Sequence, residues 1–150
     1  MTGDPDLKKI LENMFHHQKL AVLATQESAE PYCNLVAFSH SDDLKKLFFA
    51  TSRNTRKCKN LTENPRVCML VDNRTHAETD FTRGIVATAF GTASEVPPEQ
   101  RTERLDAHLQ RHRSLGPLLS SEDRTLIQIE VSHYIIISNF EHVSVLQIKN

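Results

Sequence analysis

Residues 51–60 of this 150-residue chain, TSRNTRKCKN, concentrate positive charge in one short segment. They contain four Arg or Lys residues and no acid, although the whole chain carries 18 basic and 19 acidic residues. Threonine and serine hydroxyls lie among these cations. Cationic side chains and hydroxyls bind phosphate through charge-assisted hydrogen bonds. The segment is therefore a candidate phosphate-binding site.

The segment lies where a predicted strand at 47–51 gives way to a predicted short helix at 54–61, with Asn54 or Thr55 as the N-cap. Cations at a helix N-terminus oppose the helix dipole, at about 0.3–1 kcal/mol each on an exposed surface. Glu63, the only acid of this helix, lies at its C-terminal end, which is also unfavourable. A bound phosphate dianion would resolve the conflict, because backbone N–H groups, hydroxyls and cations would converge on it. A solvated basic turn is the alternative.

Glycine is absent from residues 51–60. Walker loops and G-x-G-x-x-G turns depend on glycines that let the backbone approach the phosphates. The segment therefore gives no support to a nucleoside-triphosphate or dinucleotide fold. A mononucleotide or another phosphoester held by side chains fits these residues better.

The elements that must position this segment are mostly short strands. Apolar or alternating runs separated by turn residues predict strands at 20–25, 32–38, 47–51, 67–71, 85–96, 126–137 and 143–148. Gly91, inside the fifth run, predicts a β-bulge or bend. The short spacing favours antiparallel pairing over β-α-β units, and so predicts a small β-barrel.

Helices are predicted at the margins of this barrel. Apolar residues three and four apart predict an amphipathic helix near the N-terminus, with Asp4 as its N-cap: Leu7, Ile10, Leu11, Met14 and Phe15. A polar helix is predicted to run from Pro98 to about Arg113, and residues 115–121 are predicted to form a loop. The length of the chain fits one domain over residues 1–150.

Residues 19–96 contain four segments whose order along the chain is informative: LAVLAT, PYCNLVAF, LFFATSRNTRKCKNL and NPRVCMLVDN. Their order, and above all the motif T-S-R-x-T-R-K-x-x-N-L, resembles the pyridoxamine 5′-phosphate oxidase-like, FMN-binding split-barrel superfamily. The resemblance implies a mainly β fold, a six-stranded antiparallel split β-barrel of Greek-key topology with flanking α-helices. It also implies a homodimer that holds one FMN in each of two clefts between subunits.

The resemblance also assigns residues to the FMN phosphate. Arg56 and Lys57 would bind it, with Ser52 and Thr55 as hydroxyl donors. Arg53 is a weaker candidate, and the alternative is that it faces solvent.

A second group of residues would contact the rest of the flavin. By the same resemblance, Asn34, Leu35 and Val36 would line it through backbone groups. Ala50 and Thr51 would flank the ring or the ribityl chain. The far face of the ring would come from the partner subunit.

The resemblance leaves the reaction open. Family oxidases recognise their substrate with an arginine-containing C-terminal segment, and residues 141–150 contain no arginine. The leading hypothesis is an FMN-dependent oxidoreductase of unknown substrate. The alternatives are a non-enzymatic FMN-binding or electron-carrying module, and a haem-binding or haem-handling protein with His133 or His142 as the iron ligand.

Composition narrows the other function classes. A net charge of −1 argues against a dedicated nucleic-acid-binding domain. No apolar run approaches the roughly 20 residues that a membrane span needs. Three cysteines without C-x-x-C spacing fit neither a disulfide framework nor a zinc site, and the acidic N-terminus does not fit a secretory signal. The cytoplasm is the expected compartment.

We interpret the following histidines and cysteines as structural residues rather than as ligands or catalytic groups. His108 and His112 are four apart on a predicted helix, but their charged neighbours indicate a solvated face rather than a metal site. No metal ligand is therefore assigned. Cys33 and Cys68, inside strand runs, are predicted to be small core residues.

Overall fold

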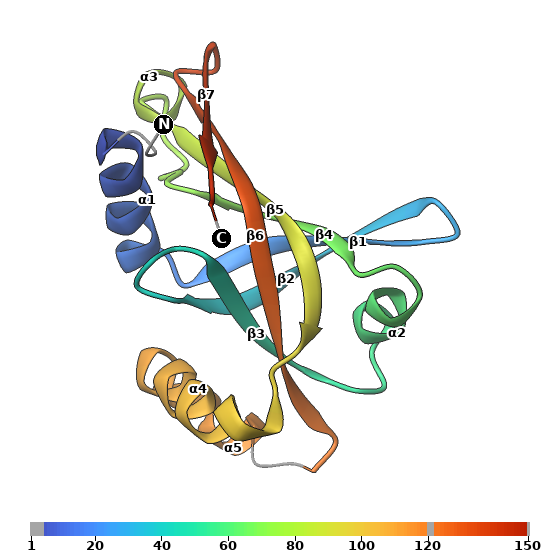
Figure 1. Ribbon diagram of the computed structural model, residues 1–150. Coiled ribbons are helices and arrows are strands. Elements are labelled where there is room, and N and C mark those ends of the chain that lie inside the picture. Colours follow the sequence, from blue (N-terminus) through green and yellow to red (C-terminus); the bar gives the residue numbers. More distant parts are fainter. Residues whose placement is uncertain (1–4, 120–121, 150) are drawn as a thin grey trace.

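The computed structural model describes residues 5–119 and 122–149, which form a barrel with helices around it (Figure 1). The predicted N-cap Asp4 lies outside the described residues. The elements are α1 (Pro5–His17), β1 (Leu20–Glu27), β2 (Glu30–His40), β3 (Lys46–Ser52), α2 (Arg56–Glu63), β4 (Arg66–Asp72), α3 (Asp80–Arg83), β5 (Ile85–Glu95), α4 (Pro98–Arg111), the 3₁₀ helix η1 (Arg113–Leu115), α5 (Gly116–Leu119), β6 (Arg124–Ser138) and β7 (His142–Gln147).

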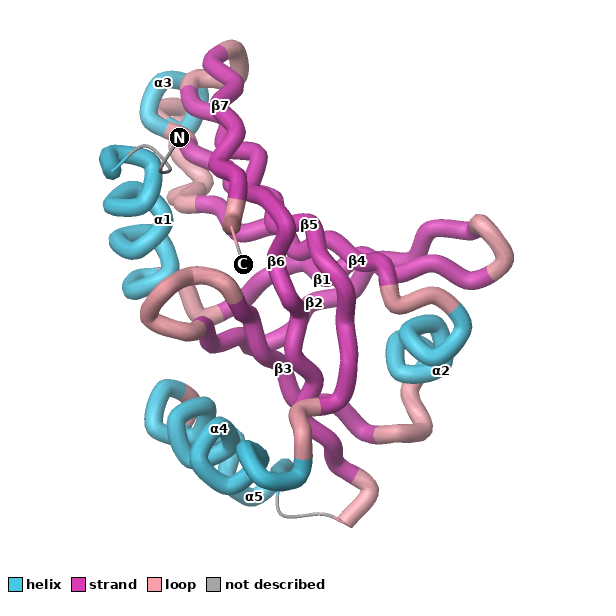
Figure 2. The backbone as a smooth tube through the Cα atoms, in the orientation of Figure 1, coloured by secondary structure: helices cyan, strands magenta, loops and turns pink. Residues whose placement is uncertain are grey.

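Six of the strands close into an antiparallel barrel (Figure 2). The strand order is β3-β2-β1-β4-β5-β6, and β6 pairs back onto β3. The first four strands have the Greek-key order, because β4 returns to lie beside β1. The predicted mainly β, six-stranded barrel with flanking helices is thereby confirmed. The seventh predicted strand, β7, pairs only with β6.

The length of β6 lets one strand serve two parts of the fold. Residues 124–130 close the barrel against β3, whereas residues 133–138 form a hairpin with β7. Its pairing with β5 shifts register between Phe90 and Gly91, which confirms the predicted bulge. A Cβ atom on Gly91 would lie 2.2 Å from the carbonyl oxygen of Glu130, so the close strand approach requires glycine there.

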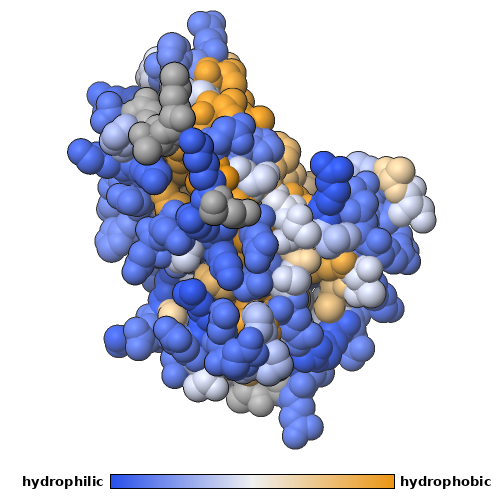
Figure 3. All heavy atoms as spheres, viewed as in Figure 1, coloured by the Kyte–Doolittle hydropathy of each residue, from blue (hydrophilic) through white to orange (hydrophobic). Residues whose placement is uncertain are grey.

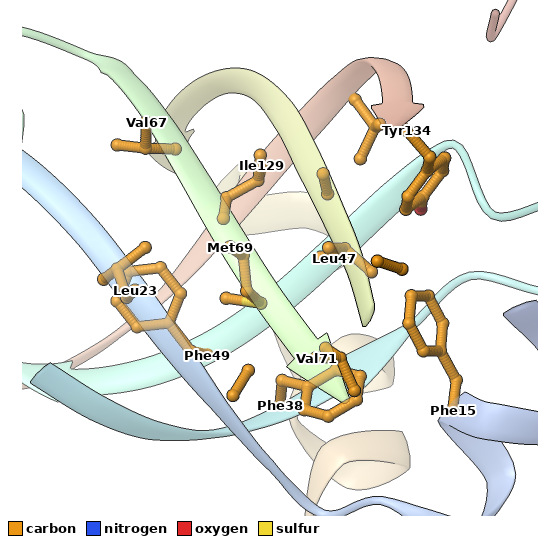
Figure 4. Packing of buried hydrophobic residues seen from close by; sticks show 14 of the residues in the cluster. Phe15, Leu23, Phe38, Leu47, Phe49, Val67, Met69, Val71, Ile129 and Tyr134 are labelled. Atoms are coloured by element: carbon orange, nitrogen blue, oxygen red, sulfur yellow. The ribbon is translucent and has the colours of Figure 1, made fainter. Parts of the chain in front are cut away.

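The barrel interior is filled by apolar side chains from every barrel strand, and α1 adds a contact at one end (Figure 4). The Phe15 ring of α1 packs edge-on against Phe38, with ring centroids 5.4 Å apart. The hydroxyl of buried Tyr134 donates to the carbonyl oxygen of Leu44 at 2.7 Å. The tight packing makes the barrel a rigid support for its loops and edges.

Two predictions about individual segments were wrong. Of the loop predicted at 115–121, residues 115–119 belong to η1 and α5, and residues 120–121 lie outside the described residues. Cys33 is exposed and Cys68 only half-buried, because both face away from the core. Ala24 pairs with Cys33 on one side and with Cys68 on the other, so the three share the outer face of the sheet. Among the described residues, no helix has the length and apolar character that crossing a membrane requires.

Candidate functional site

Strands β2 and β3 separate shortly after they meet. They pair only at Phe38–Phe49, Ser39–Phe48 and His40–Leu47. Beyond this point residues 34–36 pair only with β1, and residues 50–52 pair only with β6. Two strand edges therefore face each other without pairing, and their backbone groups remain available to a ligand. We call these two edges, 34–36 and 50–52, the seam.

The seam leads to the turn between β3 and α2, residues 52–57, which we call the elbow. Thr55 is the N-cap of α2: its side-chain oxygen accepts a hydrogen bond from the N–H of Cys58 at 3.3 Å. The Thr51 and Thr55 hydroxyl oxygens lie 3.0 Å apart, and Thr55 donates to the carbonyl oxygen of Ser52. The predicted hydroxyl groups therefore also hold the turn in shape.

Two elbow residues have partners elsewhere in the protein. The Ser52 hydroxyl donates to the carboxylate of Asp123 at 2.6 Å. The guanidinium of Arg53 pairs with Glu95 at 2.6 Å on the surface. Arg53 is exposed, which agrees with the alternative left open for it, and the Ser52 hydroxyl already donates its proton to Asp123.

The other two cations of the elbow differ from each other. Arg56 lies 3.5 Å from the carboxylate of Glu27 and over the ring of Tyr32, and it remains half-exposed. Such surface pairs contribute little to stability. In the part of the chain that the structure describes, no carboxylate forms an ion pair with Lys57. Burial, together with the nearby Arg124 guanidinium, lowers the pKa of the Lys57 amine.

Arg124 is the residue that sequence reasoning missed. It opens β6 directly opposite Ser52 and brings a second cation close to Lys57. Its Nε atom is buried and has no hydrogen-bond partner. Among the described residues neither cation forms an ion pair, and two neighbouring cations repel each other unless an anion lies between them. Only the closure of β6 onto β3 reveals this arrangement, since Arg124 lies far from the basic segment in sequence.

Two amide side chains have buried oxygen atoms without hydrogen-bond partners. The Asn34 side-chain oxygen, on the β2 edge of the seam, has no hydrogen-bond partner. Asn60, on α2, donates to Thr25 at 3.0 Å, yet its own side-chain oxygen is unpartnered. Unpaired buried polar atoms call for an explanation, and a polar ligand in the seam is one. The residues therefore fit a group that carries a phosphate and a polar ring edge.

The histidines considered as possible ligands lie outside the seam and the elbow. His108 and His112 are buried against β2, so the predicted solvated face was wrong. His133 stacks flat on Phe90 with ring centroids 4.8 Å apart, and His142 is exposed at the start of β7. Within the described residues, no three His, Cys, Asp or Glu side chains are placed to hold a metal ion.

Comparison with known proteins identifies the fold's relatives. The family model described as "Pyridoxamine 5'-phosphate oxidase" matches residues 7–137. No curated protein matches the sequence. Among solved structures, the general stress protein 26 from Bacillus anthracis is 21% identical and superposes with a TM-score of 0.72, over 95% of this chain and 98% of that one.

Two further structures carry ligand names. A FAD-binding protein from Mesorhizobium loti is 17% identical, with a TM-score of 0.64 over 95% of this chain and 93% of that one. A heme binding protein from Mycobacterium smegmatis is 13% identical, with a TM-score of 0.83 over 96% of this chain. This chain spans only 59% of the length of the latter. At these identities the structures establish a shared fold and nothing about ligands.

Proposed function

Because the chain belongs to the pyridoxamine 5′-phosphate oxidase family, within the FMN-binding split-barrel superfamily, we propose that it binds FMN non-covalently at the seam and the elbow. The flavin would serve an oxidoreductase reaction on a small molecule. The observation that supports this proposal is the pair of neighbouring cations, Lys57 and Arg124, neither of which forms an ion pair among the described residues. A phosphate monoester supplies the two negative charges that this pair calls for.

The phosphate would be held by Lys57, Arg124 and Arg56. Arg56 is available because its half-exposed contact with Glu27 is weak. Each hydrogen bond between these cations and the phosphate is worth about 1.5–3 kcal/mol. Thr55 and Ser52 hold the elbow in place, and the N–H groups at the start of α2 add the favourable end of the helix dipole.

The rest of the flavin would lie along the seam. The unpaired edge at Asn34, Leu35 and Val36 offers backbone donors and acceptors to the polar edge of the ring, and the Asn34 amide oxygen is free to accept. Ala50 and Thr51 form the opposite edge. When bound, FMN supplies the electron or hydride transfer itself, so these residues need only bind and orient it.

The proposal includes a homodimer. A row of residues across the outer face of the sheet is apolar, with a single threonine, and none of its members is fully buried: Leu35, Val22, Leu70, Thr88, Ile135 and Val145. Hydrophobic side chains also gather over the upper ends of β6 and β7 (Figure 3). A second copy would bury this face in an isologous interface. Leu35 belongs to both the row and the seam, so the partner would adjoin the flavin.

The experiment is a titration of the protein with FMN and with riboflavin, which lacks the phosphate. We expect Lys57→Gln and Arg124→Gln each to weaken FMN binding roughly 10- to 100-fold and to leave riboflavin binding unchanged. Arg53→Gln is the matched control, because this elbow cation already pairs with Glu95. A protein that takes up no FMN would contradict the proposal.

Two alternatives predict different spectra and kinetics. A flavin-binding carrier would bind FMN without turning over NAD(P)H, pyridoxamine phosphate or quinones in stopped-flow reduction. A haem-binding protein would show a Soret band that is lost in His133→Ala, since His133 lines an outer pocket of about 570 Å³. All three cysteines are free thiols, which suits the cytoplasm that we propose as the location.

A further inference from the structure

The first half of α4, residues 98–105, contacts the side of the seam that β3 and β6 form. The helix follows β5 closely, and the N–H of Val96 donates to the carbonyl oxygen of Leu126 on β6 at 2.9 Å. Arg101 donates to the carbonyl oxygen of Arg124 at 2.9 Å. Leu105 packs against a small apolar cluster that includes Leu126. The beginning of α4 is therefore attached to β6.

The same half of α4 also covers β3 where this strand enters the seam. Phe48, on β3, is a buried member of the small apolar cluster, and the guanidinium carbon of Arg104 lies 5.0 Å from the centroid of its ring. Ala50, which belongs to the seam, packs against the same cluster as Leu105 does. The edge 50–52 of the seam is thus supported by this half of the helix.

The second half of α4 is attached to the other strand of the seam, β2. His108 Nδ1 lies 2.7 Å from the hydroxyl of Ser39. Arg111 donates to the carbonyl oxygen of Phe38 at 3.0 Å, and His112, directly after the helix, places its Nε2 atom 2.7 Å from the same oxygen. Phe38, Ser39 and His108 are buried, so water does not compete for these contacts.

The contacts of α4 lie on both strands at the point where the strands separate (Figure 1). Phe38 pairs with Phe49 and Ser39 with Phe48, whereas residues 34–36 and 50–52 form no pair with each other. Arg101 and Arg111 are ten residues apart on α4, so about 15 Å of helix joins the two sets of contacts. A hydrogen-bonded helix of this length is stiff, and it therefore links the two sides of the seam rigidly.

Such a link matters because two unpaired strand edges attract each other. If the edges of the seam paired, they would approach to the strand spacing of about 4.8 Å and use the backbone groups that a ligand needs. A stiff element attached to both strands opposes this closure, and it also opposes wider opening. A seam held at one width before a ligand arrives binds that ligand at a lower entropic cost.

We propose that α4 is a brace that fixes the separation of the two seam edges, and that Leu105 and Ser39 are positioning residues for the flavin ring. The proposal rests on the FMN site proposed above and adds residues that do not touch the flavin. The elbow cations act on the phosphate, whereas the brace acts on the ring. The two groups of residues therefore differ in their expected effect on riboflavin, which has the ring without the phosphate.

The test titrates the full-length protein and its variants with FMN and with riboflavin. Leu105→Ala weakens the brace on the β3–β6 side, and Ser39→Ala removes the partner of His108 on β2. We expect each variant to bind both flavins about tenfold more weakly, because both flavins carry the ring. Lys57→Gln should weaken FMN alone. Leu105→Met keeps the side-chain volume and should retain the affinity of the unaltered protein.

Leu109→Ala is the matched control. This leucine also belongs to α4, but it lines a surface pocket beside Gly116 and is not part of the apolar cluster over β3. Its variant should bind both flavins as the unaltered protein does. Every titration is made at a temperature where a melting curve shows the variant to be folded, so that a loss of affinity is not a loss of fold.

A second measurement uses the reciprocity of coupled equilibria. If α4 fixes the seam, riboflavin should slow amide hydrogen exchange in residues 98–111, and the slowing should be smaller in Leu105→Ala. Four outcomes would overturn the brace and leave the FMN site standing: unchanged affinity in Leu105→Ala and Ser39→Ala, a loss confined to FMN, an equal loss in Leu109→Ala, or exchange in α4 that riboflavin does not alter. An unaltered protein that binds neither flavin would overturn both proposals.

Discussion

Two helices of this protein carry clusters of basic side chains, and the two clusters differ in what satisfies them. At the start of α2, Lys57 adjoins Arg124, and the Nε atom of Arg124 has no partner. At the end of α4, Arg111 and His112 contact backbone carbonyl oxygens and His108 contacts Ser39 through Nδ1, although His108 Nε2 is buried without a partner. We propose that the first cluster binds an anion, whereas the second contacts the barrel and α1.

The acceptors of the α4 cluster come mainly from β2 and the end of α1. His108 Nδ1 lies 2.7 Å from the Ser39 hydroxyl, and His112 Nε2 lies 2.7 Å from the carbonyl oxygen of Phe38. Arg111 donates to the same Phe38 carbonyl and to the carbonyl oxygens of Phe15 and Gln18. A basic side chain does not by itself indicate a ligand-binding site, because backbone carbonyl oxygens of the same chain can accept its hydrogen bonds.

Removal of Arg111 is the most severe change that this comparison predicts. Arg111→Ala would remove the donor from the carbonyl oxygens of Phe15 and Gln18, whereas the Phe38 carbonyl would keep its contact with His112. Each unpaired buried acceptor costs about 1–3 kcal/mol. We expect the free energy of unfolding in urea to fall by about 3–5 kcal/mol. Arg113→Ala is the matched control, because this neighbouring arginine is exposed, and it should change stability by less than about 0.5 kcal/mol. A loss below about 1 kcal/mol in Arg111→Ala would mean that the α4 cluster does not hold the helix.

Acid should weaken the α4 cluster in a defined pH range. His108 is 0% exposed, and burial, with His112 and Arg111 nearby, lowers the pKa of its imidazole from 6.5 to about 4. The folded protein therefore binds this proton less readily than the unfolded chain does. The stabilising contribution is complete above pH 6.5 and is lost as the pH falls from 6.5 to about 4, with a maximum near 3 kcal/mol.

Urea unfolding at several pH values between 7 and 4 measures this loss. In His108→Gln the dependence should be shallower, because a group that cannot titrate has replaced the one that does. His16→Gln is the control, since His16 is exposed at the end of α1. A pH dependence that persists in full in His108→Gln would assign it to other groups.

The sequence predicted what depends on local pattern. Thr55 as a candidate N-cap of α2, the bulge at Gly91 and the seven strands all follow from neighbouring residues, and all are confirmed. Features that depend on the pairing of distant strands could not be predicted from neighbouring residues. Arg124 reaches the elbow only because β6 pairs with β3, and the strand register alone turns Cys33 outward.

The two clusters are hardest to distinguish by sequence, although the site depends on telling them apart. His108 and Arg111 sit in a polar run that looks solvated, and the basic run at the elbow looks no different in type. Only the tertiary structure shows that backbone carbonyl oxygens accept from Arg111 and His112 in the α4 cluster, whereas the Nε atom of Arg124 at the elbow has no acceptor. The assignment of Arg56 and Lys57 to a phosphate therefore stays a prediction until ligand binding is measured.

The smallest effect that we predict has the opposite sign to the first. In the FMN-free protein, Lys57→Gln relieves repulsion with Arg124 and should raise the free energy of unfolding by about 0.5 kcal/mol, or leave it unchanged. The same substitution should weaken the proposed FMN binding, so we expect stability and affinity to change in opposite directions. Urea unfolding without flavin, at low and at high salt, measures the gain, which salt should screen. A loss of more than about 1 kcal/mol in Lys57→Gln would show that the chain itself satisfies this lysine, as it does Arg111, and that the elbow is a second structural cluster.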